Sequence, residues 1–210
     1  SDHWIQSRLN NAAIQIEHNF KKYRLDLALQ SAYDFTWHEL CDWYLELSKP
    51  ILQSPEVSIE KKRGTQKTLI EVLEATLRLL HPFMPYITEE IWQDVAPRAK
   101  IKSNTIMHRP FPESATQVYD DILVSEIEWV RQFILGIRQI RGEMNISPGK
   151  PVPVILQDAD ISDISRKDSH ALLLKNVGRI KSMSILDKKD NPPTAATALL
   201  GNMRLLVPMK

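Results

Sequence analysis

Between Asp26 and Lys49 the chain carries a polar residue at every fourth position and apolar residues almost everywhere else. The recurring polar positions are Gln30, Asp34, His38, Asp42 and Glu46. On a helix, residues four apart lie one above the other, so these side chains form one narrow polar stripe. A helix with so little polar surface has to be surrounded by neighbours. Residues 26–49 are therefore predicted to form the central helix of a bundle, capped by Asp26 and ended by Pro50 and Pro55.

Four further segments repeat apolar residues at steps of three and four, which is the pattern of amphipathic helices. In the first, residues 2–23, the apolar positions are Ile5, Leu9, Ala12, Ile16, Phe20 and Tyr23. The others cover residues 69–80, stopping before Pro82, residues 85–95, starting at Pro85, and residues 120–142. The fold class predicted is mainly α, with about five helices forming a bundle over residues 1–147. Residues 96–114 are expected to be an ordered crossover lying on that bundle.

After Pro148 the pattern changes to a small α+β tail over residues 148–210. Residues 152–156 and 180–186 are predicted as strands, and residues 162–177 as a helix closed by Gly178. Gly201 and Asn202 form a two-residue turn between residues 197–200 and 203–207, which favours a β-hairpin.

The composition excludes several classes of protein. The chain has 210 residues, a net charge of +1 and a single cysteine, Cys41. No apolar run approaches the ~20 residues of a membrane span, so no membrane contact is expected. One cysteine cannot form an internal disulfide, which fits a cytoplasmic location. The near-neutral charge is not that of a typical nucleic-acid binder, so any RNA contact has to come from local clusters of basic residues.

The sequence shows no catalytic site. The six histidines never occur as a pair at metal-ligand spacing, and one cysteine cannot supply a zinc site. No glycine-rich phosphate loop and no nucleophile motif is present. We therefore expect no catalytic residue, no metal and no cofactor in this chain.

Two local clusters are candidates for RNA contact. The first combines Lys21, Lys22 and Arg24 at the end of the first helix with the nearest aromatic residues, Phe35 and Trp37. Aromatic side chains can stack on unpaired bases, although packing in the core is the alternative for each of them. The second cluster follows the last bundle helix, where Arg138 and Arg141 are expected to face outward. Arg131 and Lys150 join them there as candidates for contacting phosphates. Ordinary cations at a helix C-terminus are the alternative reading.

Three segments give the chain a family resemblance: IRQIRGEMNISPGKP at residues 137–151, YDFTWHELCDWYLELSKP at 33–50 and LRLLHPFMPYITEEIW at 77–92. Together they resemble the C-terminal part of valyl-tRNA synthetases. HPFMPYITEEIW is shared in form with the isoleucyl, leucyl and methionyl relatives, whereas EMNISPGK and FTWHELCDWYLELSKP distinguish the valyl family.

The resemblance implies a class I anticodon-binding bundle that contacts the anticodon stem-loop of tRNA(Val). It also implies that a separate catalytic domain of the same parent chain attaches valine with ATP and Mg, and that an inserted domain edits. Neither domain is in these residues, and a coiled coil is expected beyond Lys210. The chain is therefore expected to be a binding fragment without catalysis of its own. The alternatives are the same bundle from an isoleucyl-tRNA synthetase and a freestanding helical interaction module that does not bind tRNA.

Overall fold

The computed structural model describes residues 1–112, 121–186, 190–191 and 193–209. It divides into two compact units, Ser1–Val124 and Ser125–Lys210, here called the N-terminal and C-terminal units. The mainly α fold with a small α+β tail is confirmed. The division differs from the expected boundary after residue 147, because the helix expected to complete the bundle groups with the strands that follow it.

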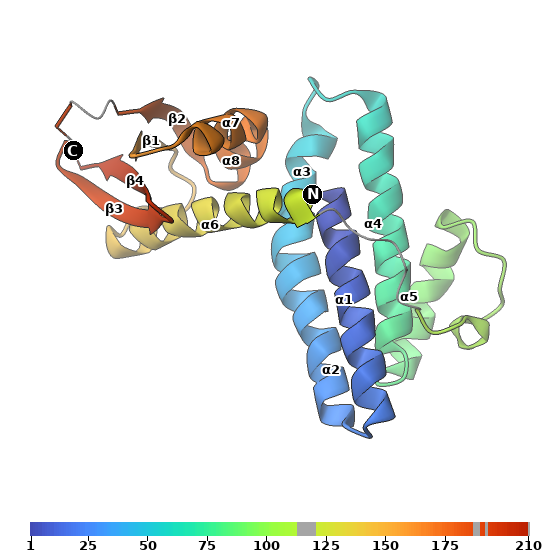
Figure 1. Cartoon of the computed structure of the whole chain (residues 1–210). Helices are drawn as coiled ribbons and strands as arrows, with labels where there is room; N and C mark the ends of the chain where they lie inside the picture. The colour runs from blue at the N-terminus through green and yellow to red at the C-terminus, as the bar shows by residue number, and fades with distance from the viewer. Residues whose placement is uncertain (113–120, 187–189, 192, 210) are drawn as a thin grey trace. The chain divides into compact units, whose positions relative to one another are not determined.

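The N-terminal unit consists of helices and connecting turns (Figure 1). Its elements are α1 (Asp2–Lys21), α2 (Leu25–Asp34), η1 (Phe35–Tyr44), α3 (Leu45–Gln53), α4 (Ile59–Leu80), α5 (Pro85–Arg98) and the short 3₁₀ helix η2 (Ile106–His108). Helix α1 packs against both α2 and α4, and α4 also contacts α5. The largest fully buried side chains include Trp4, Tyr44 and Trp92, from α1, η1 and α5.

The elements α2, η1 and α3 follow one another as a single helical rod (Figure 1). Its middle part, η1, is a π-helix in which each N–H bonds five residues back, as the Leu45 N–H does to the Leu40 carbonyl. On an α-helix a polar residue at every fourth position drifts by about 40° per step. A π-helix has more residues per turn, so a step of four residues falls short of a full turn and reverses this drift. The polar stripe therefore stays on one side of the rod. Gln30, Asp34, His38 and Asp42 are all exposed, as predicted.

The prediction that this helix is enclosed on its other sides is wrong. Leu25, Leu29, Tyr33 and Trp37, also spaced by four, form a second exposed stripe next to the polar one. The helix also continues through Pro50 and ends at Gln53, so that only the cap residue Ser54 separates it from Pro55. Periodicity shows which residues share a side of a helix, but not how many sides have a neighbour. A site for an apolar or aromatic ligand is one reason for such a stripe.

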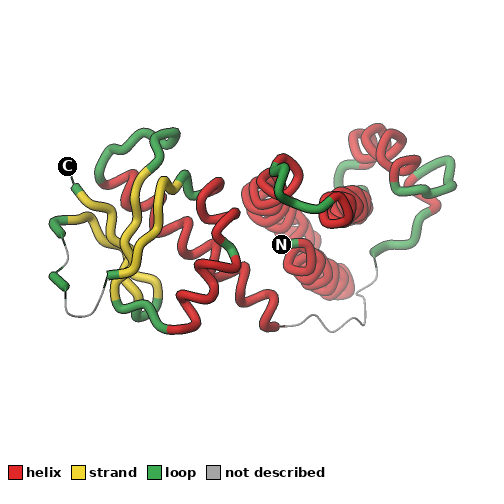
Figure 2. The backbone as a smooth tube through the Cα atoms, turned by 90° about the horizontal axis from the view of Figure 1, so that it is seen from above, coloured by secondary structure: helices red, strands yellow, loops and turns green. Residues whose placement is uncertain are grey.

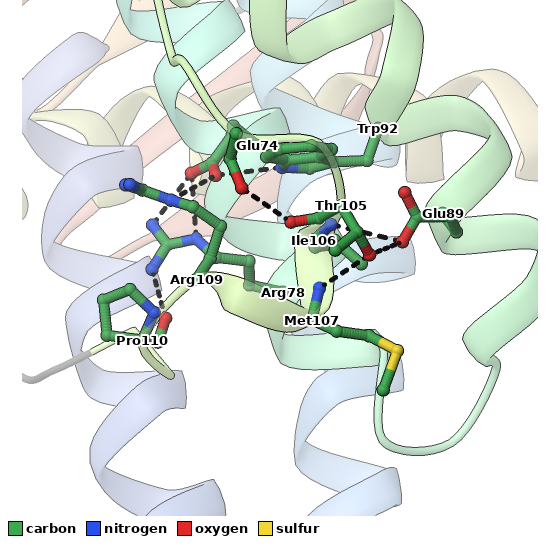
Figure 3. Close-up of polar contacts among 10 residues, drawn as sticks. Glu74, Arg78, Glu89, Trp92, Thr105, Ile106, Met107, Arg109 and Pro110 are labelled. Carbon is green, nitrogen blue, oxygen red and sulfur yellow. Dashed lines mark hydrogen bonds and ion pairs between the residues drawn. The ribbon is translucent and has the colours of Figure 1, made fainter.

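The crossover begins later than predicted, because α5 continues to Arg98. Residues 99–112 lie on the bundle as expected, and residues 113–114 fall outside the described part of the chain. Its anchor is the buried carboxylate of Glu74, which accepts hydrogen bonds from Trp92 Nε1 at 3.0 Å and from Arg78 Nη2 at 2.8 Å (Figure 3). Arg78 Nη1 in turn donates to the Pro110 carbonyl at 2.8 Å. A second carboxylate, Glu89, accepts from Thr105 Oγ1 at 2.6 Å. These bonds fix the crossover against α4 and α5.

The C-terminal unit packs helices beside a four-stranded sheet (Figure 2). Its elements are α6 (Asp121–Glu143, of which the first four residues belong to the N-terminal unit), β1 (Val152–Gln157), α7 (Ile161–Ser169), α8 (Ala171–Val177), β2 (Ile180–Ile185), β3 (Ala195–Leu200) and β4 (Met203–Pro208). The strand order is β2-β1-β4-β3. Strands β1 and β2 are parallel, and the other neighbours are antiparallel. The predicted hairpin at Gly201-Asn202 is confirmed, and the helix predicted over residues 162–177 is divided at His170.

The apolar face of α6 packs on this sheet. Ile134, Ile137 and Ile140 are fully buried. At Gly136 a Cβ atom would lie 3.1 Å from Leu205 Cδ1 and 3.3 Å from Ala198 Cβ, so the absence of a side chain lets the helix approach β3 and β4 closely. Four of the five predicted apolar positions, Ile127, Val130, Ile134 and Ile137, are buried, whereas the first, Leu123, is 44% exposed. The partner of this face is the sheet rather than a helical bundle. The predicted start of the helix, Asp120, lies outside the described residues.

Candidate functional site

The turn between α1 and α2 presents a tyrosine to solvent. Tyr23 has a left-handed backbone (φ 56°), and its N–H donates to the Phe20 carbonyl at 2.9 Å. The Arg24 N–H reaches the Asn19 carbonyl, also at 2.9 Å, which completes a Schellman-type helix end. A bulky residue adopts this conformation at a cost, and such residues gather at functional sites. The Tyr23 side chain is 91% exposed, so it is not part of the apolar stripe in which the sequence pattern placed it.

Acidic neighbours neutralise two of the three cations predicted at this turn. Lys21 Nζ lies 2.6 Å from Glu17 Oε1, one helical turn earlier. Arg24 binds Asp26 through two hydrogen bonds of 2.9 and 2.7 Å, and these bonds lower the pKa of that carboxyl to about 2. Lys22 is exposed and makes no ion pair with any residue in the described part of the chain. Lys22 is therefore the cation of this cluster best placed to meet an external phosphate.

A groove lies farther along the same rod, between α2–η1 and the end of α4. It has a volume of about 540 Å³. Its lining residues are Asp26, Leu29, Gln30, Tyr33, Thr36, Trp37, Leu80 and Met84. The rings of Tyr33 and Trp37 lie nearly parallel, at 11°, with centroids 6.5 Å apart. Both side chains are about half exposed, at 50% and 54%. Aromatic faces held open to solvent in an apolar groove are suited to a flat, unpaired ring such as a nucleobase.

The two aromatic residues selected from the sequence have different surroundings. Trp37 lines the groove, whereas Phe35 is 2% exposed and belongs to the core. The reason is geometric, since residues two apart on a helix point to nearly opposite sides. Phe35 is therefore unable to stack on a ligand. Tyr33, which was not selected, takes its place, and its position four residues before Trp37 is the signal that identifies it.

The predicted outward position of Arg141 is wrong. Its side chain is 7% exposed, and its guanidinium donates to four backbone carbonyls. Nη1 reaches Ser147 at 3.1 Å and Lys150 at 2.7 Å, and Nη2 reaches Gly178 at 3.3 Å and Arg179 at 2.8 Å. The residue therefore ties the turn after α6 to the turn after α8. Such a clamp depends on the five donors of a planar guanidinium.

The other three cations of the second cluster differ in how accessible they are. Arg131 is partly buried, and its Nη1 donates to both oxygens of the Glu128 carboxylate, at 2.8 and 3.0 Å. Because this ion pair competes with any other anion, Arg131 is less suited to binding an external phosphate. Arg138 and Lys150 are exposed. These three residues and Arg141 belong to the C-terminal unit. The other candidates belong to the N-terminal unit: Lys21, Lys22, Arg24, Phe35 and Trp37.

Metal sites and membrane-spanning helices are not found in the described residues. Among the described residues, no group of three or more histidine, cysteine or acidic side chains is arranged to hold a metal ion. In the same part of the chain, no helix has the length and apolar character that a membrane crossing requires. The exposed turn and the aromatic groove remain the features with the character of a binding surface.

Comparison with known proteins agrees with this assessment. The chain is 41% identical over 209 residues to a valine–tRNA ligase of Legionella pneumophila (strain Paris); the match covers the whole of this chain and 23% of that protein. The chain thus spans about a quarter of the length of this relative. Residues 2–156 match the family described as the anticodon-binding domain of tRNA ligase. The match extends over the groove, the exposed turn and α6, and the chain belongs to this family of tRNA-ligase anticodon-binding domains.

Proposed function

We propose that this chain is the anticodon-binding part of a valine–tRNA ligase and that it binds the anticodon stem-loop of tRNA(Val). The family match and the similarity to the Legionella enzyme support this function. The single observation in the structure that carries it is the parallel, half-exposed pair Tyr33 and Trp37 in an apolar groove. RNA readers prefer single-stranded loops, whose bases can turn outward and stack on aromatic rings.

In this proposal the loop bases stack in the groove and the backbone of the loop follows the rod toward the α1–α2 turn. Twelve residues separate Leu25 from Trp37, which is about 18 Å along a helix. That length suits a loop of several nucleotides. Lys22 then contacts a phosphate, and Tyr23 offers a second aromatic surface at the exposed end. Arg24 holds Asp26 at the mouth of the groove, where its charge offsets that of the carboxylate.

The catalytic chemistry of the parent enzyme is assigned to a different domain. We propose that a catalytic domain of the same parent chain uses ATP and Mg to attach valine to the bound tRNA, in the cytoplasm. The present residues would supply affinity and orientation for the tRNA and would take no part in bond making. Substitutions in the groove should therefore act on tRNA and not on valine activation.

The test is a tRNA-binding measurement on the chain with Trp37→Ala. Base stacking contributes about 1–3 kcal/mol per base, so the dissociation constant for tRNA(Val) should rise by roughly 5- to 150-fold. Trp37→Phe keeps an aromatic face and should recover most of the affinity. The matched control is Leu45→Ala, which removes another exposed apolar side chain from the same rod outside the groove.

In the full-length enzyme, Trp37→Ala should raise the Michaelis constant for tRNA while leaving valine-dependent pyrophosphate exchange unchanged. Equal tRNA affinity for the Trp37→Ala variant, the Leu45→Ala variant and the wild type would remove the groove from the proposed interface. A tRNA carrying altered anticodon bases supplies the second comparison, because a groove that reads the loop must lose affinity for it.

A further inference from the structure

The turn between α1 and α2 holds Tyr23 in a backbone conformation that suits glycine better than tyrosine. The turn lies at one end of the N-terminal unit, where α1 leads into α2 (Figure 1). Tyr23 comes directly after Lys22, the cap residue of α1, and has φ 56°. Helices most often have glycine at this position, because a residue with a Cβ atom adopts the left-handed conformation only at a cost in free energy.

Contacts of the Tyr23 side chain do not offset this cost. The side chain is 91% exposed, and neither its ring nor its hydroxyl makes a hydrogen bond or ring contact within the described part of the chain. Lys22 is exposed as well and has no ion pair with a described residue, whereas Arg24 is held by Asp26. One turn thus presents an aromatic ring and an ammonium group side by side in the sequence, both open to solvent.

The end of α5 has the same turn without an aromatic ring. The Lys100 N–H donates to the Pro97 carbonyl at 3.1 Å, and the Ile101 N–H donates to the Ala96 carbonyl at 2.9 Å, in the pattern seen after α1. Lys100 has φ 58° and is also exposed. Because the two turns share their backbone conformation, Lys100 allows the effect of backbone strain to be separated from the effect of the Tyr23 ring.

We propose that Lys22 and Tyr23 together bind one unpaired nucleotide outside the aromatic groove, with its base stacked on the Tyr23 ring and its phosphate bound by the Lys22 ammonium. Every base has a π-face that can stack on such a ring, so the site accepts any of the four bases. The proposal rests on the proposed tRNA-binding function and deepens it, since it assigns a nucleotide of its own to the turn. In this assignment the Tyr23 ring adds affinity for RNA at a small cost in fold stability.

The test measures fold stability and tRNA binding on the same variants. Tyr23→Gly removes the ring together with the strain, so its melting temperature should not fall and should rise by up to about 4 °C. Its dissociation constant for tRNA(Val) should rise by about 5-fold or more, because a stacked base is lost. The matched control, Lys100→Gly, relieves the same strain and should bind tRNA as the wild type does.

Two further variants separate the ring from the flexibility that glycine adds. Tyr23→Asn removes the ring but keeps a residue that tolerates the left-handed backbone, so it should lose as much affinity as Tyr23→Gly. Tyr23→Phe keeps the ring and should bind tRNA as the wild type does.

Salt dependence separates the two binding groups. Lys22→Gln should reduce the slope of log affinity against log salt by about 0.7, the value for one phosphate of a single strand. Tyr23→Gly should leave the slope unchanged, since a neutral ring releases no counterions.

The outcomes distinguish this site from the proposed function. Wild-type affinity in Tyr23→Gly and Lys22→Gln, with weakened binding in Trp37→Ala, would overturn the nucleotide site and leave the tRNA function intact. A melting temperature of Tyr23→Gly below that of the wild type would also overturn it, because the ring would then be needed for the fold. Absence of any tRNA binding by the wild type at low salt would remove both.

Discussion

Arg141 shows how a single residue can be assigned the wrong role from sequence. A charged residue near a helix end, three positions from another arginine, has the pattern of an exposed cation. Its actual partners are four carbonyls in two turns, and the second turn follows about 37 residues later. Neither the pattern nor the spacing contains that information, because the partners come together only when the sheet forms. The exposed position of Trp37 in the groove, by contrast, depends on local helical geometry, and its contact with RNA stays a prediction.

The clamp makes a prediction for Arg141→Lys, which keeps the positive charge but replaces a planar fork of five donors by three donors on one nitrogen. A lysine ammonium cannot reach both turns at once, so buried carbonyls lose their partners. The C-terminal unit should be destabilised by about 2–4 kcal/mol, measured by thermal unfolding. Amide exchange should rise in residues 144–151 and 178–180. Arg138→Lys, at an exposed site one turn away, is the control and should unfold as the wild type does. Equal melting of both variants would show that the four bonds are not needed.

At the scale of elements, the apolar pattern identifies which side of a helix is buried but not what covers it. The buried positions of α6 follow the predicted steps of four and three, and yet they pack on β3 and β4 rather than in a bundle. Gly136, which has no side chain, allows the close approach of α6 to Ala198 of β3 and Leu205 of β4. The π-helix η1 was missed for a related reason, since no residue type marks it and only the strict four-residue polar repeat hints at a wider turn.

The packing of α7 and α8 on α6 makes a prediction about pH. Glu126 lies between Arg166 Nε at 2.8 Å and His170 Nε2 at 3.4 Å. Burial lowers the pKa of His170 below its usual 6.5, although Glu126 opposes the shift. Burial raises the pKa of Glu126, but the bonds and charges of Arg166 and His170 outweigh it and leave that pKa below its usual 4.5. Because both folded-state values are depressed, each group stabilises the fold at higher pH and loses that contribution as the pH falls.

The melting temperature should therefore decrease from about pH 7 downward through the titration of His170, and again below about pH 4.5 through Glu126. His170→Gln should flatten the first decrease, while the second remains. The difference between the two proteins isolates the contribution of His170, because every other residue is the same in both. An identical pH profile for the variant and the wild type between pH 7 and 5.5 would show that His170 is not linked to stability.

At the scale of the whole molecule, the net charge of +1 is a sum over the chain and does not show where basic residues are clustered. Overall composition gave no sign of RNA binding, because acidic side chains balance the cations, at the exposed turn itself through Glu17 and Asp26. The family match over residues 2–156 extends from the N-terminal unit into the first strand of the C-terminal unit. The matched region thus includes residues of both units.

The five tryptophans provide a test that covers the whole chain at once. Trp4, Trp43, Trp92 and Trp129 are buried, and Trp37 alone among them is exposed. A small neutral quencher such as acrylamide should therefore act chiefly on Trp37, and its neutrality prevents the RNA charge from repelling it. Saturation with tRNA(Val) should lower the quenching constant toward that of the buried tryptophans, because a stacked base covers the indole. The Trp37→Phe protein should show weak quenching with and without tRNA. Quenching of the wild type that does not change at saturating tRNA would place the RNA away from the groove, even if binding itself were strong.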